Sequence, residues 1–388
     1  MFKKLISVSL AFVISLTSFV FMTANAGYGE RGVDYETVTF EDMYYDIFKD
    51  HAVLNYGNNK SGDVIIPSVV EGVPVTRIGV AAFEEDYDMT SVTIPDTVKE
   101  IGQIAFKRCK IKSVEIPDSV EKIENGAFVG CVNLTDVKMS ENIKYIGSGA
   151  FAMTPWLDEQ SKKAPMFIIN DILVDGSNCT GDVIVPDTIK SIVGGAFCGN
   201  NNITSIVFPQ GIEIIEDVSV CENLKKVVLP DSVKRIEQWA FMQDTSLDEI
   251  NIPKSVEFIG KWAFYDCKIK KLEIKNPDCV IEDITTDDKL KDIIICGYEN
   301  STAQEFAEKY GAEFEILSDY IAGDANLDGN VTISDAVYIL QYLANSEKYP
   351  LDGQALINAD CDGKEGVTGL DAVSIQKFDA GVINSLPE

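Results

Sequence analysis

Residues 94–118 read IPDTVKEIGQIAFKRCKIKSVEIPD, so this stretch begins and ends on the same Ile-Pro-Asp signature. The pattern between the two signatures recurs along most of the chain, and its most regular element is an Ala-Phe pair. The phenylalanines of these pairs are Phe83, Phe106, Phe128, Phe151, Phe197, Phe241 and Phe264. Neighbouring pairs are 22 or 23 residues apart, or 46 and 44 residues apart where the pattern is interrupted or degenerate. A fixed period of this length indicates a repeat architecture.

Each repeat predicts one short strand followed by a turn. Val114-Glu115-Ile116 alternates apolar and polar residues, so one face of such a strand is buried. The proline that follows lies where the strand has ended, and its missing N–H therefore costs little. The Ile, Ala, Phe and Leu positions point inward, and a repeat can bury them only against its neighbours. The expected fold is a solenoid of short parallel strands with α/β-type repeats.

These repeats resemble the bacterial surface-antigen type of leucine-rich repeat, called BspA-like. The resemblance covers residues 61–300 and rests on several copies of a multi-residue motif. We expect residues 27–60 to cap the first repeat, and residues 301–318 to cap the last one with a helix and a strand. Residues 154–182 interrupt the period and are expected to project as a loop or an extra hairpin.

The composition excludes several classes of function. The chain has 33 Lys and Arg against 62 Asp and Glu, and its net charge of −29 leaves no global attraction for nucleic-acid phosphate or anionic lipid. The single histidine, His51, excludes a His-rich metal centre and disfavours His-dependent catalytic triads. No paired acids stand in a glycosidase context, and no nucleophile motif occurs. We therefore expect no catalytic residues and no enzymatic activity.

The nine cysteines follow the repeat. Cys109, Cys131 and Cys267 each lie three residues after a repeat phenylalanine. Disulfides are the alternative in an exported chain. Because the spacing follows the repeat and the total is odd, we favour small buried thiols stacked along the array.

The N-terminus is typical of an export signal. Lys3 and Lys4 precede an apolar stretch at residues 5–22, and Ala24-Asn25-Ala26 fits the small-x-small cleavage rule. A transmembrane anchor is the alternative, since the apolar stretch is near the shortest spanning length. Because no basic stop follows the Ala-x-Ala site, we expect residues 1–26 to be a cleaved signal peptide and the protein to be secreted, associated with a complex at the cell surface.

Two tryptophans occupy the same place in neighbouring repeats. Trp239 and Trp262 both precede an Ala-Phe pair and are 23 residues apart. If adjacent repeats stack, the two indoles lie side by side and form a platform for a sugar ring or an aromatic partner. The alternative is that both rings pack at the flank of the array.

The C-terminal region opens with an acidic loop that matches a calcium-binding pattern. Calcium takes about six to eight oxygen ligands, and spacing of this kind folds them around one point. A glycine stands at the turn position, position 6. The oxygen-bearing residues at positions 1, 3, 5, 7 and 12 are Asp324, Asn326, Asp328, Asn330 and Asp335.

A second acidic loop follows, and the segment Asp371-Ala372-Val373 matches Asp335-Ala336-Val337 at a separation of 36 residues. With Asn358 as its first residue, this loop has a two-residue insertion around Lys364. Both the insertion and the initial Asn are expected to weaken the second site. The predicted ligands of the second loop are Asn358, Asp360, Asp362, Lys364 and Asp371. The sequence after each loop predicts a helix, and two Ca²⁺ ions are the expected cofactors.

The duplicated loop–helix halves of residues 323–388 resemble a type I dockerin module, the calcium-dependent plug of cellulosome assemblies, which residues 319–322 would link to the array. The resemblance implies a small all-α domain that docks into a cohesin domain of a scaffoldin. In that family the contact positions lie just before position 12 and along the following helix. Carried over, the cohesin-binding residues are Ile333, Ser334, Leu340, Gln341, Gly369, Leu370, Gln376 and Lys377. Because the two halves differ at these positions, we expect one preferred docking orientation.

The sequence thus favours a non-catalytic, exported cellulosome component. The dockerin would attach it to a scaffold, and the array would present a recognition surface for a protein or for cell-wall material. Two alternatives stay open. One is a carbohydrate-binding accessory protein that uses Trp239 and Trp262, and the other, less favoured, is a polysaccharide hydrolase.

Overall fold

The computed structural model describes residues 35–386 except residues 58, 299, 318–320, 352 and 365. The predicted signal peptide, the first residues of the predicted N-terminal cap and residues 319 and 320 of the predicted linker lie outside this part of the chain. The chain divides into two compact units, Met1–Glu315 and Ile316–Glu388. In the part of the chain that the structure describes, no helix is both long enough and apolar enough to cross a membrane.

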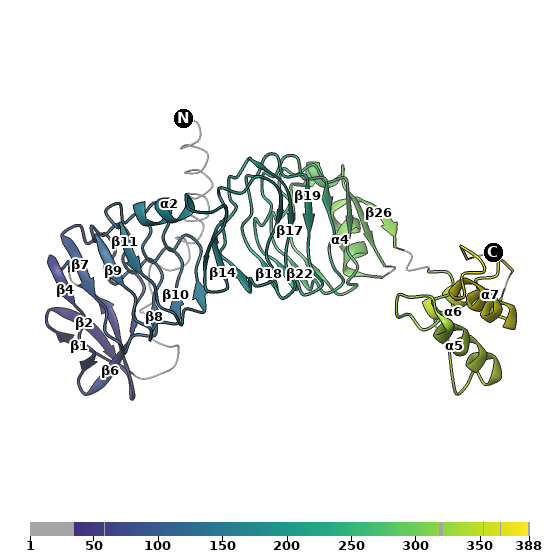
Figure 1. The fold of residues 1–388 in the computed structure, drawn as a ribbon, viewed down its shortest axis with the longest axis horizontal. Coiled ribbons are helices and arrows are strands. Elements are labelled where there is room, and N and C mark those ends of the chain that lie inside the picture. The colour runs from purple at the N-terminus through teal and green to yellow at the C-terminus, as the bar shows by residue number, and fades with distance from the viewer. Residues whose placement is uncertain are drawn as a thin grey trace. The chain divides into compact units, whose positions relative to one another are not determined.

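The first unit is a stack of coils in which each repeat forms one coil with two short strands (Figure 1). Strands of neighbouring coils pair in parallel, so that Ile101, Ile123 and Ile146 lie opposite one another. The first strands of successive coils are β4 (Gly62–Ile65), β7 (Met89–Thr93), β9 (Ser113–Glu115), β11 (Asp136–Lys138), β15 (Gly181–Ile184), β17 (Ile203–Val207), β19 (Lys226–Val228), β21 (Glu249–Ile250), β23 (Lys271–Glu273) and β25 (Ile294–Gly297). The second strands are β6 (Val73–Ile78), β8 (Glu100–Ile101), β10 (Lys122–Ile123), β12 (Tyr145–Ile146), β16 (Ser191–Ile192), β18 (Ile214–Ile215), β20 (Arg235–Ile236), β22 (Phe258–Ile259) and β24 (Val280–Ile281). The expectation of a parallel-strand solenoid is confirmed.

The two ends of the stack are closed by additional elements. At the N-terminal end, β1 (Glu36–Phe40), β2 (Met43–Ile47) and β3 (Ala52–Tyr56) form antiparallel pairs, and β3 continues in parallel to β6, which also pairs with β5 (Val69–Val70). At the C-terminal end lie α3 (Asp287–Leu290), α4 (Thr302–Tyr310) and β26 (Glu313–Ile316). The side chain of Ser301 accepts the Gln304 N–H at the start of α4, and Gly311, with φ of 68°, ends it. Ala303, Phe306 and Ala307 turn the apolar side of α4 toward the core.

A column of stacked phenylalanines runs through the core. The rings of Phe83, Phe106, Phe128 and Phe151 are nearly parallel, with successive centroids 5.3, 5.1 and 5.3 Å apart. Each ring is buried. Since the same residue recurs at the same place in each coil, each side chain meets its own kind above and below, and stacking supplies the burial that a single repeat lacks.

The cysteines form a second buried column. The Sγ atoms of Cys109 and Cys131 donate to the carbonyls of Phe83 and Phe106 in the preceding coils, each at 2.9 Å. All nine cysteines lie within the described residues, none forms a disulfide, and only Cys198 and Cys267 are partly exposed. This agrees with the expectation of buried thiols. Burial raises the pKa of the Cys131 thiol to about 12, so the thiol stays protonated as a hydrogen-bond donor.

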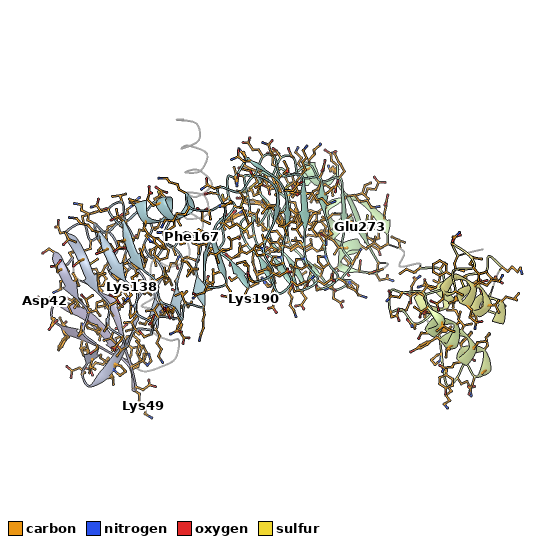
Figure 2. The ribbon with its side chains drawn as sticks, in the orientation of Figure 1. Asp42, Lys49, Lys138, Phe167, Lys190 and Glu273 are labelled. Atoms are coloured by element: carbon orange, nitrogen blue, oxygen red, sulfur yellow. The ribbon has the colours of Figure 1, made fainter. Side chains whose placement is uncertain are left out.

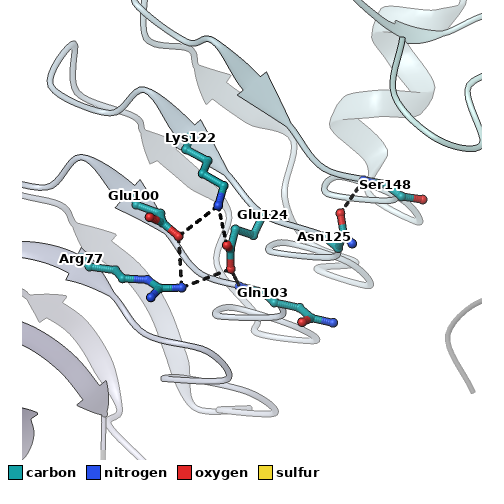
Figure 3. Close-up of polar contacts among 7 residues, drawn as sticks. All are labelled: Arg77, Glu100, Gln103, Lys122, Glu124, Asn125 and Ser148. Carbon is teal, nitrogen blue, oxygen red and sulfur yellow. Dashed lines mark hydrogen bonds and ion pairs between the residues drawn. The ribbon is translucent and has the colours of Figure 1, made fainter. Parts of the chain in front are cut away.

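Charged side chains form ladders between coils on the outside of the stack. Lys138, visible on β11 in Figure 2, lies 2.5 Å from Glu115, its neighbour 23 residues earlier in the chain. The densest ladder joins four residues of three coils (Figure 3). Arg77 lies 3.0 Å from Glu100 and 3.4 Å from Glu124, and Lys122 lies 2.7 Å from Glu124. The ladders thus pair charges of opposite sign at the same place in neighbouring coils.

The structure corrects the expectation that residues 154–182 project from the array. This segment contains α2 (Pro155–Ser161) and a hairpin of β13 (Phe167–Ile169) and β14 (Ile172–Asp175), and β14 pairs in parallel with β16. A hairpin is present, but the segment does not project. Trp156 is only 5% exposed and its ring lies 4.8 Å from that of Phe151. The indole continues the phenylalanine column and so holds the segment in the core.

The second unit contains three helices, α5 (Ile333–Ala344), α6 (Gln354–Ala359) and α7 (Gly369–Asp379). Its small core lies between α5 and α7 and includes Ala336, Ile339, Ala372 and Ile375. Helices α5 and α7 begin with the same arrangement, a threonine N-cap followed three residues later by an aspartate in a capping box. The local sequence therefore determines where both helices start.

Candidate functional site

The first acidic loop, residues 324–335, is organised by its own carboxylates. Asp324 accepts hydrogen bonds from the backbone N–H groups of Asp328 (3.1 Å) and Gly329 (3.0 Å). Asp335 accepts the N–H groups of Asn326 (3.0 Å) and Thr332 (2.9 Å). These bonds hold the side chains of the first and last ligand positions against the inside of the loop.

The middle of this loop is polar and exposed. The N–H of Asn330 donates to Asp328 at 2.8 Å, and this bond, with a further one from the Asn326 side chain, lowers the pKa of Asp328. The carboxylate is thus kept ionised. The loop presents side-chain oxygens of Asp and Asn at the spacing that a hard divalent cation requires.

The second acidic loop repeats several of these hydrogen bonds at a shift of 36 residues, but Asp360 accepts the N–H of Gly366 (2.8 Å), whereas Asp324 accepts those of Asp328 and Gly329. Asp371 accepts the N–H groups of Asp362 (2.9 Å) and Thr368 (2.7 Å), as Asp335 accepts those of Asn326 and Thr332 in the first loop. The N–H of Lys364 donates to Asp362 at 2.8 Å. The equivalent bond of the first loop, from Asp328 to Asn326, is also 2.8 Å long.

The register predicted for the second loop is therefore wrong. With a shift of 36, Asp360 takes position 1, and the two loops have the same length without an insertion. Asn358 lies before the loop, where its buried side chain donates to the carbonyl of Asp324 at 3.1 Å and accepts from Gln354 at 2.8 Å. It connects the halves instead of facing the loop centre. Lys364 takes position 5, the place of Asp328.

The donor set of both loops fits calcium. The carboxylate oxygens of Asp360, Asp362 and Asp371 come within 4.8 Å of one another. A cluster of oxygen donors without nitrogen or sulfur ligands suits Ca²⁺. Lys364, however, brings an ammonium group where the first loop has a carboxylate. The residues that would hold the ions are Asp324, Asn326, Asp328, Asn330 and Asp335 in the first loop and Asp360, Asp362 and Asp371 in the second.

The predicted cohesin-binding residues lie on α5 and α7. Apart from Lys377, which is half-buried, all are exposed: Ile333, Ser334, Leu340, Gln341, Gly369, Leu370 and Gln376. Helix α5 exposes a longer apolar face than α7. Ile333 is 58% and Leu340 47% exposed, and Val337, Tyr338 and Leu343 are exposed between and beside them. An exposed apolar stripe of this kind marks a place where another protein surface can pack.

The structure does not bring the two tryptophans of the predicted platform together. Among the described residues, no ring contact joins Trp239 and Trp262. Trp262 is 38% exposed and packs beside Tyr265 and under the ammonium group of Lys261. Trp239 lines a pocket of about 390 Å³. The two indoles thus have different surroundings, and a platform shared by both stays a prediction.

The pocket beside Trp239 contains residues that the sequence did not single out. They include Tyr145, Glu216 and Glu237, which come from three coils. Glu216 lies in the repeat without an Ala-Phe pair, so the periodic pattern gave no signal for it. Burial raises the pKa of Glu216, and the neighbouring carboxylates of Glu237 and Asp217 raise it further.

The comparisons with known proteins define the family. A family model described as BspA type leucine-rich repeat region matches residues 62–170 and 168–285 in six copies. Since these matches cover more than half of the chain, the protein belongs to this family. Its members are typically non-catalytic and are typically surface or secreted bacterial proteins.

Solved structures with similar chains are also leucine-rich repeat proteins. The pneumococcal vaccine antigen PcpA is 15% identical, with 73% of this chain and 98% of that chain covered and a TM-score of 0.40. A leucine-rich repeat protein from Bacteroides ovatus is 23% identical, with 79% and 72% covered and a TM-score of 0.35. A curated relative, a xylanase/beta-glucanase from Ruminococcus flavefaciens, is 48% identical over 75 residues. The match covers 17% of this chain and 9% of that enzyme, so the chain spans less than a tenth of its relative's length.

Proposed function

We propose that the protein is a non-catalytic, secreted component of a cellulosome, and that its C-terminal unit is a type I dockerin that binds two Ca²⁺ ions and docks into a cohesin domain of a scaffoldin. The observation that carries the proposal is the pair of loop–helix halves related by 36 residues, with the same backbone hydrogen bonds to the aspartate at position 12 of each loop. Such a duplication makes two cation loops and two similar helices in one small unit.

The similarity to the Ruminococcus flavefaciens enzyme supports this proposal. The shared stretch is a small part of that xylanase/beta-glucanase. A short stretch shared by an enzyme and a repeat protein suits an attachment module better than a catalytic domain. The leucine-rich repeats would then be the cargo, presenting a recognition surface in a complex that acts on polysaccharides.

Calcium would supply part of the stability of the C-terminal unit. Residues 323–388 carry 3 Lys and 11 acids, a net charge of −8, which two Ca²⁺ ions would halve. The unit has a small core, so metal ligation adds free energy that packing alone does not provide. Asp324, Asp335, Asp360 and Asp371 hold the ends of the two loops and would orient the remaining ligands.

The test is binding of the full chain to a panel of cohesin domains, measured by calorimetry with Ca²⁺ and with chelator. We expect at least one cohesin to bind in Ca²⁺ and none in chelator. Absence of binding to a broad panel would contradict the docking role.

The same assay tests the orientation of docking. Because α5 exposes the larger apolar face, Ile333→Asp with Leu340→Asp should weaken binding at least tenfold more than Leu370→Asp with Gln376→Asp. Ile65→Asp, an exposed apolar position on the array, is the matched control and should have no effect. Equal, small losses for both helices would argue against one preferred orientation.

A further inference from the structure

The pocket beside Trp239 is elongated along the axis of the array. Its lining comes from turns of six coils, near residues 103, 125, 146, 194, 216 and 238. Although β14 lies between the strands of the third and fourth of these coils, their turns are adjacent, since Ser148 donates to the carbonyl of Gly194 at 2.8 Å. Strands of neighbouring coils lie about 4.8 Å apart, so five such steps extend over about 24 Å. A site that follows the axis for this distance suits a chain better than a compact small molecule.

The charges of the pocket exclude anionic ligands. No Lys, Arg or His lines it, whereas three carboxylates do. Two of these already have partners, since Glu237 lies 2.7 Å from Arg235 and Asp217 accepts the N–H of Ser219 at 3.0 Å. The third, Glu216, has no ion-pair partner among the described residues. Burial raises its pKa, although a hydrogen bond from the backbone of Gly194 acts in the opposite direction. The negative charge that could attract a cationic ligand is therefore smaller than the three carboxylates of the pocket would suggest.

The pocket also combines apolar faces with unused hydrogen-bonding groups. Tyr145 and Trp239 supply aromatic surface. The indole N–H of Trp239 is buried and has no acceptor among the described residues. The side-chain amide of Gln103 makes no hydrogen bond to them either, and the side-chain oxygen of Asn125 accepts the N–H of Ser148 at 2.9 Å, which leaves its NH₂ group as a donor (Figure 3).

These features require a ligand that both donates and accepts hydrogen bonds and that has apolar faces. A cation donates only, and a lysine or arginine side chain would leave the indole and amide donors without acceptors. Sugar hydroxyls do both, and the C–H face of a pyranose packs against aromatic rings.

We propose that this pocket binds a neutral polysaccharide chain, with Trp239 packing against one sugar ring and with Glu216, Gln103 and Asn125 hydrogen-bonding to hydroxyl groups. A neutral polysaccharide would then be the ligand of the array. Binding there does not depend on docking by the C-terminal unit.

The backbone offers a well-matched pair of variants. Trp239 and Trp262 both have positive φ, 66° and 58°, at a place where other coils have Gly126, Gly149 and Gly195 in the same conformation. Trp239→Gly and Trp262→Gly therefore remove one indole each while keeping a residue that this turn prefers. Only the first indole lines the pocket.

The experiment is native gel electrophoresis of the full chain in gels that contain hydroxyethylcellulose, xyloglucan, mixed-linkage β-glucan, arabinoxylan or galactomannan, followed by calorimetry with the polysaccharide that retards most. We expect retardation by at least one of them and an affinity at least tenfold lower for Trp239→Gly. Trp262→Gly should stay within twofold of the wild type. Glu216→Gln, which still bonds to hydroxyls, should bind more tightly than Glu216→Ala.

Three results would overturn the proposal: no retardation by any of the five polysaccharides, equal losses for the two tryptophan variants, or binding of poly-lysine in their place. Added chelator should leave retardation unchanged. A chain that binds polysaccharide but no cohesin would thus contradict the docking role alone, and a chain that binds cohesin but no polysaccharide would contradict this inference alone.

Discussion

Buried aspartates, Asp86 and Asp244, stand in two coils at the position where other coils have a cysteine. Cys109, Cys131 and Cys267 each lie three residues after a repeat phenylalanine, and each donates to a carbonyl of the preceding coil. Three residues after Phe241, the chain has Asp244 instead. One of its oxygens accepts the N–H of Cys221 at 2.7 Å, and the other is buried without a partner among the described residues. Burial raises the pKa of Asp244 well above the usual range, so the folded state favours the protonated acid, which can donate as the thiols do.

We therefore expect Asp244→Asn to stabilise the array at pH 7. The folded pKa lies above the unfolded one, so the folded chain holds a proton that the unfolded chain releases, and the free energy of unfolding falls as pH rises from about 4 toward 7. Asparagine keeps the shape without titrating and should add about 1–2 kcal/mol at pH 7, with a smaller gain at pH 5. Urea unfolding at both pH values measures this. Asp187→Asn, at an exposed position, is the control, and a variant less stable than wild type at pH 7 would refute the expectation.

Lys364 is the residue that distinguishes the two acidic loops. It occupies position 5, where Asp328 stands in the first loop, and its ammonium group opposes a cation held by Asp360, Asp362 and Asp371. Lys364→Asp should strengthen the weaker calcium-binding step about tenfold, because affinity of such loops rises with the number of charged ligands. Calcium titration of the full chain by calorimetry measures both steps. Lys348→Asp changes the net charge equally outside the loops, so an equal gain there would mean that the effect is not one of ligation.

At the scale of elements, the ladder of Arg77, Glu100, Lys122 and Glu124 couples three neighbouring coils. Removing Arg77 leaves two partly buried carboxylates near each other with one cation between them. We expect Arg77→Gln to lower the free energy of unfolding of the array by about 1–3 kcal/mol. Urea denaturation followed by circular dichroism measures this.

The matched control for the ladder is Arg108→Gln. Arg108 pairs with Glu85 at 2.7 Å, but its side chain is 58% exposed, so water screens the pair and the loss should stay below about 0.5 kcal/mol. Equal losses for the two variants would mean that burial of the ladder adds nothing.

Some elements of the fold could be predicted from the sequence pattern and others could not. The Ala-Phe spacing predicted the coils, because each inward position repeats and only stacking can bury it. The sequence pattern misplaces the second acidic loop, because counting from Asn358 puts Gly363 at the turn position, position 6. The hydrogen bonds of Asp371 place that glycine at position 4. Likewise, no periodic signal indicated that Trp156 would enter the core, since its burial depends on a gap that only the folded coils create.

At the scale of the whole molecule, the two units of the chain differ in what stabilises them. The first unit, which contains the array, has long cores of stacked side chains from Met43 onward, whereas the second unit has a core of a few residues beside two acidic loops. We expect the free energy of unfolding of the array to come from burial and not to depend on calcium. That of the second unit includes repulsion among loop carboxylates, which a bound cation relieves.

Heating the full chain should accordingly give two transitions, of which one depends on calcium. We expect chelator to lower the midpoint of the smaller transition by more than 10 °C and to leave the larger one within about 2 °C, as ligand linkage requires when a metal binds only one folded unit. Differential scanning calorimetry with Ca²⁺ and with chelator measures both. Asp335→Ala with Asp371→Ala should reproduce the chelator profile in Ca²⁺, because it removes position 12 of both loops. A single transition with the same midpoint in both buffers would contradict calcium-dependent folding of the second unit.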